Sequence, residues 1–116
     1  MDIEIKEHHE DGFRPLTSYG GWRVGIANGC ERLLRENIKR LERHNETDEV
    51  FVLITGEATL YIGKEMTEYK MELGKVYNVK RGVWHAISMT MDAMVAIIEN
   101  DDTGFHNSDL YYFEEK

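Results

Sequence analysis

The sequence is poor in the two residues that most constrain a chain covalently. It has one cysteine, Cys30, and one proline, Pro15, among 116 residues. A single cysteine excludes an internal disulfide and a thiolate zinc cluster within one chain. It also suits the reducing cytoplasm. Because no base lies near Cys30 in the sequence, we do not expect this thiol to act as a nucleophile.

Long hydrophobic runs and an excess of positive charge are also missing. The longest apolar runs, such as residues 50–54 and 94–98, are too short to span a bilayer. The opening segment MDIEIKEHHEDG lacks the apolar stretch of a secretory signal, so we expect a cytoplasmic protein. Acidic residues outnumber basic ones by 22 to 14, giving a net charge of −8, which argues against partners such as nucleic acid and anionic membranes.

Short apolar or alternating segments, separated by glycine, asparagine and aspartate, are typical of an all-β domain. The length of the chain and its hydrophobic fraction of 41% fit one globular domain with a single core. The expected strands cover residues 2–7, 22–27, 49–54, 58–62, 68–72, 75–79, 84–89 and 94–99. This pattern predicts a β-sandwich or barrel.

The segment CERLLRENIKRLERH, residues 30–44, is ambiguous. Leu34, Ile38 and Leu41 have the spacing of an amphipathic helix, and the segment is rich in helix formers. The choice matters because Glu42 and His44 would point apart on a helix but share one face on a strand. Periodicity alone leaves both alternatives open.

Two acids, Asp48 and Glu49, stand directly before the apolar run at residues 50–54. Charges at the mouth of a buried strand cost free energy unless a partner compensates them. His44 lies just upstream of the two acids, and His85 shares the phase of Val83 and Ile87, so it is expected to point into an apolar interior. These residues are therefore candidates for an internal site.

The spacing of these residues resembles the two motifs of the cupin superfamily. Four residues separate His44 from Glu49, and six more lead to Gly56. Seven residues separate Gly74 from Gly82, and two more lead to His85. The 17 residues between Gly56 and Gly74 suit the short hairpin that separates the motifs in small cupins.

This resemblance implies a cupin-like double-stranded β-helix, or jelly-roll barrel, formed by one domain over residues 1–116. Residues 37–44 are then expected to be extended, with a short helical turn near residues 30–35. Small cupins often bury an N-terminal strand against a partner, and Ile3 and Ile5 alternate with charges in residues 2–7. We therefore expect a homodimer.

Carried over position by position, the metal-ligand slots of the family fall on Glu42, His44, Glu49 and His85. The sequence departs from the family pattern at Glu42, where a histidine is usual, and also at Lys80 and Met89. Glutamate is itself a metal ligand, so the resemblance implies a divalent metal ion such as Mn, Fe, Ni or Zn. Without a metal, Glu42 and Glu49 would crowd two carboxylates and raise the pKa of at least one.

Each of these residues also has a purely structural interpretation. Asp48 and Glu49 would then pair with Arg40 or Arg43 at the surface, which contributes little to stability. His44 would be a loop histidine, and His85 a core histidine bonded to the backbone. The remaining histidines, which are His8, His9 and His106, are expected to be exposed to solvent.

Two functions from different classes follow from the resemblance. The first is a metal-dependent enzyme acting on a small polar metabolite by isomerase, lyase or dioxygenase chemistry. The second is a cupin that binds a small molecule without turnover because Glu42 has degraded the metal site. A ligand-free structural β-sandwich dimer is a third, weaker alternative. Metal content distinguishes the first two alternatives.

Overall fold

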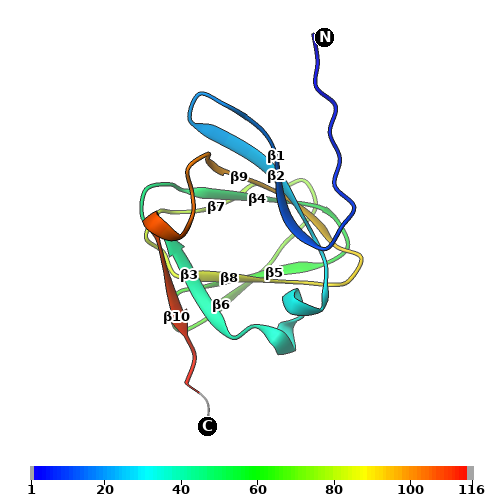
Figure 1. Ribbon diagram of the computed structural model, residues 1–116. Helices are drawn as coiled ribbons and strands as arrows, with labels where there is room; N and C mark the ends of the chain where they lie inside the picture. Colours follow the sequence, from blue (N-terminus) through cyan, green and yellow to red (C-terminus); the bar gives the residue numbers. More distant parts are fainter. Residues whose placement is uncertain (1, 115–116) are drawn as a thin grey trace.

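In the computed structural model, which describes residues 2–114, the chain forms two five-stranded sheets that pack face to face (Figure 1). The strands are β1 (Gly12–Tyr19), β2 (Trp22–Asn28), β3 (Arg40–His44), β4 (Glu49–Thr55), β5 (Ala58–Ile62), β6 (Thr67–Lys70), β7 (Tyr77–Val79), β8 (His85–Met89), β9 (Met94–Asn100) and β10 (Ser108–Tyr112).

One sheet has the strand order β1-β2-β9-β4-β7, and the other has the order β10-β3-β8-β5-β6. The strand pairs in both sheets are antiparallel. The predicted all-β, cupin-like architecture is therefore confirmed, although the two sheets do not join into a closed barrel. Helical structure in the described residues is limited to three short turns, η1 (Glu31–Leu33), η2 (Arg35–Asn37) and η3 (Phe105–Asn107), none of which is long enough to cross a bilayer.

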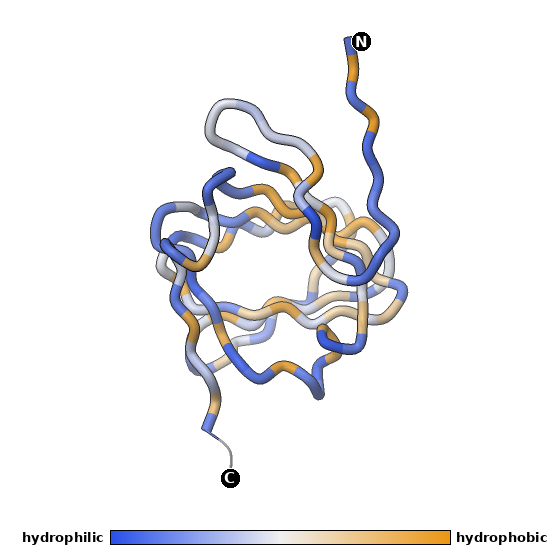
Figure 2. Tube along the Cα trace, viewed as in Figure 1, coloured by the Kyte–Doolittle hydropathy of each residue, from blue (hydrophilic) through white to orange (hydrophobic). Residues whose placement is uncertain are grey.

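The main core lies between the two sheets. Alternating side chains of β4 and β9, including Phe51, Leu53 and Val95, are buried there against Leu60 of β5. Figure 2 shows apolar segments along the central strands of both layers and polar segments in many of the loops. The site described below lies where this apolar interior gives way to polar side chains.

The ambiguous segment at residues 30–44 contains two helical turns followed by strand β3. The predicted extended conformation is confirmed for β3, whereas a second turn, which was not predicted, includes Asn37. Glu42 pairs with His85 of β8 on one side and with Leu110 of β10 on the other. Leu41 points to the opposite face, where it is fully buried in a second, smaller cluster with Tyr61. Pairing with two neighbouring strands therefore overrides the helical composition of this segment.

The N-terminal strand predicted at residues 2–7 is wrong. This segment is extended but forms no strand, and Figure 1 shows it running away from the body of the molecule. Ile3 and Ile5 are 64% and 85% exposed. Within the described residues, no strand lies beside this segment to complete its backbone hydrogen bonds. The homodimer expected from this segment stays a prediction.

Two edge strands and one buried histidine escaped the sequence analysis. Strand β1 contains Pro15 beside a break in its register, and β10 follows a polar turn, so neither gives a clear alternating pattern. His8 is buried, and its Nε2 atom donates to the carbonyl oxygen of Gly12 at 2.9 Å. The prediction that His8 is exposed is therefore wrong, whereas His9 and His106 are exposed as predicted.

The close approach of Gly29 to the turn before β9 gives a test of the packing. A Cβ atom on Gly29 would lie 1.9 Å from the carbonyl oxygen of Thr90, so Gly29→Ala must displace backbone. We expect the Gly29→Ala substitution to lower the free energy of unfolding, measured by urea denaturation, by about 1–3 kcal/mol or more. Gly21→Ala, whose Cβ meets nothing within 4 Å, is the control and should change it by less than about 0.5 kcal/mol. Equal effects of the two variants would contradict this packing.

Candidate metal centre

The predicted ligands come from strands of both sheets. Glu42 and His44 lie two residues apart on β3 and so share one face of the strand. His85 begins the neighbouring strand β8, and Glu49 begins β4 in the opposite sheet. Because Glu49 shares its face with the core residue Phe51, its side chain points between the sheets toward the two histidines.

The carboxylate of Glu49 contacts both imidazoles. Its Oε1 atom lies 2.8 Å from Nε2 of His85 and 3.2 Å from Nε2 of His44. The ring centroids of the two histidines are 5.3 Å apart. All three side chains are less than 10% exposed. The structure therefore brings three of the four predicted ligands together in a buried cluster.

Both imidazoles are anchored through their other nitrogen. Nδ1 of His85 donates to the backbone carbonyl of Val83 at 3.0 Å, and Nδ1 of His44 lies 2.8 Å from Oγ of Ser108. With Nδ1 protonated, Nε2 of His85 donates to Glu49 only when the ring carries a second proton, and loss of that proton would free the Nε2 lone pair to bind an ion. Outer hydrogen bonds of this kind fix the tautomer and orientation of metal-binding histidines. This donor set of two Nε2 atoms and a carboxylate therefore fits a divalent metal ion.

Glu42 occupies the outer side of the cluster. Its carboxylate Oε1 lies 3.8 Å from Nε2 of His44, and its side chain is 41% exposed. Ligand atoms of Glu42, His44 and His85 all lie within 4.8 Å of one another. Glu42 is thus close enough to the two histidines to join them at one ion, from a position open to solvent.

The cluster includes an acidic residue that was not predicted from the sequence, Glu99 of β9. One ligand atom each from His44, Glu49 and Glu99 lies within 4.8 Å of the others, and the Glu99 side chain is 4% exposed. Arg23 of β2 holds this carboxylate through Nε at 3.1 Å and Nη2 at 2.7 Å. A signal was present in the sequence, because Glu99 continues the inward face defined by Val95 and Ile97.

Asp48 faces away from this cluster. Its carboxylate accepts hydrogen bonds from the Arg81 backbone N–H at 2.8 Å and from Asn78 Nδ2 at 3.0 Å. These bonds hold the pKa of Asp48 below its usual value. Of the two adjacent acids at the start of β4, only Glu49 points inward. Asp48 instead stabilises β7 and the loop after it through these hydrogen bonds.

Burial and mutual charge perturb the proton affinities of the cluster. Burial opposes ionisation of Glu49, but hydrogen bonds from His44 and His85 outweigh it and hold its pKa well below its usual range. Burial likewise opposes charging of the two imidazoles, but Glu49 outweighs it and raises the pKa of both. Burial and the neighbouring Glu49 raise the pKa of Glu99 to about 7, against the opposing effect of Arg23. The predicted crowding of Glu49 with Glu42 is therefore wrong for Glu49, whose pKa is lowered, and the carboxyl with the raised pKa is Glu99, which the prediction did not include.

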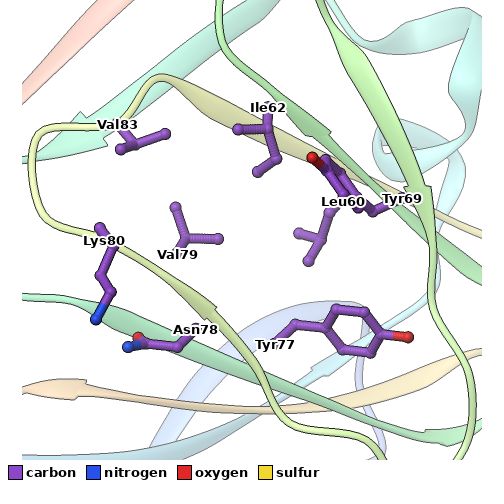
Figure 3. Close-up of a pocket in the computed structure, with 8 residues that line it drawn as sticks. All are labelled: Leu60, Ile62, Tyr69, Tyr77, Asn78, Val79, Lys80 and Val83. Carbon is purple, nitrogen blue, oxygen red and sulfur yellow. The ribbon is translucent and has the colours of Figure 1, made fainter.

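The cluster lies in the wall of a cavity of about 430 Å³, which is large enough for a small metabolite. A second cavity of about 280 Å³ lies beside β7 and is mostly apolar. Figure 3 shows Leu60, Ile62 and Val79 facing one another there. The residues that line this second cavity include no histidine and no glutamate of the site. The larger cavity is therefore the candidate functional site.

No protein-family model and no curated protein sequence matches the chain. Solved structures do match it. A cupin-2 domain protein from Shewanella frigidimarina has a TM-score of 0.62 at 17% identity, over 80% of this chain and 84% of that one. Pac13, described as a unique nucleoside dehydratase, has a TM-score of 0.65 at 5% identity, over 95% and 87% of the two chains.

The iron(II) protein HppE in complex with its substrate has a TM-score of 0.61 at 14% identity, over 76% of this chain and 52% of that one. At these identities the similarity concerns the fold. It agrees with the motif spacing from Glu42 to Met89 and with the two antiparallel sheets. The chain therefore has the fold of the cupin superfamily.

Proposed function

We propose that this protein binds a divalent metal ion through Glu42, His44, Glu49 and His85 and acts as an enzyme on a small polar metabolite. The observation that carries this proposal is the convergence of two anchored histidines on Oε1 of Glu49, at 2.8 and 3.2 Å. Histidines held by outer hydrogen bonds beside a buried carboxylate are typical of metal sites.

The charges of the site support the same proposal. In the buried part of the site, two carboxylates, Glu49 and Glu99, lie beside one guanidinium, Arg23, so two negative charges minus one positive charge leave a formal surplus of one. A buried surplus of this size requires compensation. A divalent cation supplies that compensation, and in its absence protons on the histidines and on Glu99 supply it.

When bound, the ion would act as a Lewis acid that polarises a carbonyl or hydroxyl group of the substrate. The chain contributes the surrounding geometry. Ser108 and Val83 orient the imidazoles, and Arg23 fixes the carboxylate of Glu99 beside the substrate cavity. Isomerase, lyase and dioxygenase chemistry are all compatible with such a site. That Pac13 is a dehydratase and that HppE holds iron(II) and a substrate supports metal or lyase chemistry on this fold.

The alternative is a protein that binds a small molecule without turnover. The observation that favours it is the position of Glu42, which is partly exposed and lies 3.8 Å from His44 rather than within hydrogen-bonding distance. Elemental analysis of protein purified without a polyhistidine tag distinguishes the two functions. About one metal ion per chain supports the enzyme, and no metal after reconstitution supports the alternative.

The first prediction concerns the ligands. His44→Ala and His85→Ala should each lower metal affinity by at least about 100-fold, because loss of an outer partner alone costs about 10–100-fold. Glu42→Gln should have a smaller effect, since its amide oxygen still offers a lone pair. His9→Ala, at an exposed histidine outside the cluster, is the control and should bind metal like the original chain. Titration of metal-free protein with Mn(II) or Zn(II) measures these affinities, and unchanged affinity in both histidine variants would contradict the proposal.

The second prediction concerns the metal-free protein, which should lose stability as the pH rises from about 5 to about 8. The pKa of Glu99 is raised from 4.5 to about 7, so the folded state binds more protons than the unfolded state between these values. The raised pKa values of His44 and His85 act in the same direction. Their contribution to the stability of the folded state is complete below the pKa of the unfolded state and is lost as the pH rises through the pKa of the folded state. The lowered pKa of Glu49 acts at lower pH, because its contribution to stability is lost only when the solution is acidified below this range.

Thermal unfolding in the presence of a chelator measures this dependence. The melting temperature should fall across that pH range, and it should fall less steeply in Glu99→Gln, which removes one of the titrating groups. A melting temperature that is constant or rises between these pH values would show that the cluster is not protonated as described.

A further inference from the structure

We propose that the entrance of the larger cavity is an anion-binding site in which Arg32 and Arg40 hold a carboxylate or phosphate group of the ligand. This inference rests on the proposed function for the role of the metal ion, and it names the class of substrate as a small organic anion. The arginines line the cavity together with Glu42 and His85.

Arg40 lies on the same strand face as the metal-site residues. Arg40, Glu42 and His44 are alternate residues of β3, so their side chains point to one side of the sheet. Along this face the residues change from exposed at Arg40 to half-buried at Glu42 and buried at His44. The strand therefore leads from a guanidinium at the surface to an imidazole in the interior.

The guanidinium of Arg40 is held in place by its cross-strand partner. Arg40 pairs with Tyr112 of β10, and its Nη1 atom donates to the Tyr112 hydroxyl at 3.0 Å. This bond uses one of the five N–H donors of the side chain. The remaining donors keep the planar geometry that recognises carboxylate or phosphate oxygens in pairs.

Arg32 approaches the same entrance from a different element, the turn η1. Its guanidinium lies against the start of β1, where a Cβ atom on Gly12 would come within 3.2 Å of Nη2. Arg32 and Arg40 thus reach the lining of the same cavity from different elements, η1 and β3. Two guanidinium groups that share one cavity form a site that a single surface arginine does not.

Neither arginine is neutralised by the protein. Within residues 2–114, neither Arg32 nor Arg40 forms an ion pair, whereas Arg23 in the same cavity is paired with Glu99. The chain as a whole carries a net charge of −8, whereas this entrance carries two unpaired positive charges. They would attract small anions to the cavity and favour their entry.

The size and charge of the site restrict the ligand. A cavity of about 430 Å³ accommodates a small metabolite. The carboxylate of Glu42 would repel an anion held beside it unless a cation is bound. Anion and metal ion should therefore strengthen each other's binding, and this coupling must be equal in both directions.

Calorimetric titration with succinate and with inorganic phosphate tests the site on metal-free and Mn(II)-loaded protein. Arg32→Gln and Arg40→Gln should each weaken binding of the preferred anion by about 10-fold or more, as expected for a charge-assisted hydrogen bond. Arg14→Gln, at an exposed arginine of β1 outside the cavity, is the control and should bind within about twofold of the original chain. The preference between the two probes identifies the group as carboxylate or phosphate.

Arginine-dependent binding of either anion, strengthened by Mn(II), is the expected result. Absence of binding, or equal binding by all four proteins, would overturn the anion site even if the metal content is one ion per chain. Arginine-dependent binding in a chain that takes up no metal would support the anion site and overturn the proposed metal-dependent function. The two proposals therefore fail separately.

Discussion

The compensation of one buried carboxylate, that of Glu49, organises this end of the molecule. The free-energy cost of burying a charge is large unless hydrogen bonds and opposite charges offset it. Here the Nε2 atoms of His44 and His85 approach the same oxygen of Glu49 from the opposite sheet. The two sheets are thus joined at this point by polar contacts, whereas Phe51 and Leu53 on the same face of β4 join them by apolar packing.

The outer contacts of the cluster have a consistent arrangement. Each residue that approaches Glu49 is itself held by a second group: His44 by Ser108, His85 by the backbone of Val83, and Glu99 by Arg23. Side chains fixed in this way lose little further freedom when they bind an ion, which favours binding. The exception is Glu42, which is partly exposed and beside which the cavity opens toward the two unpaired arginines.

The sequence predicts the architecture and part of the site, for physical reasons that differ between residues. The motif spacing correctly placed an extended strand at β3, where helical propensity argued otherwise, because spacing reflects tertiary pairing and propensity does not. The strand phase correctly predicted that the side chain of His85 points inward. Glu99 was missed because it lies in a strand outside both motifs. The arm at residues 2–7 was predicted as a strand from its alternation, but alternation cannot reveal whether a neighbouring strand exists.

X-ray absorption spectroscopy of the Zn(II)-loaded protein tests the proposed metal centre, because it reports the atoms bound to the ion. The spectrum should contain scattering from two imidazole rings, those of His44 and His85, with oxygen atoms in the remaining positions. In the His44→Ala variant one imidazole contribution should disappear. A loaded ion surrounded only by oxygen atoms, with no imidazole scattering, would contradict the proposed centre.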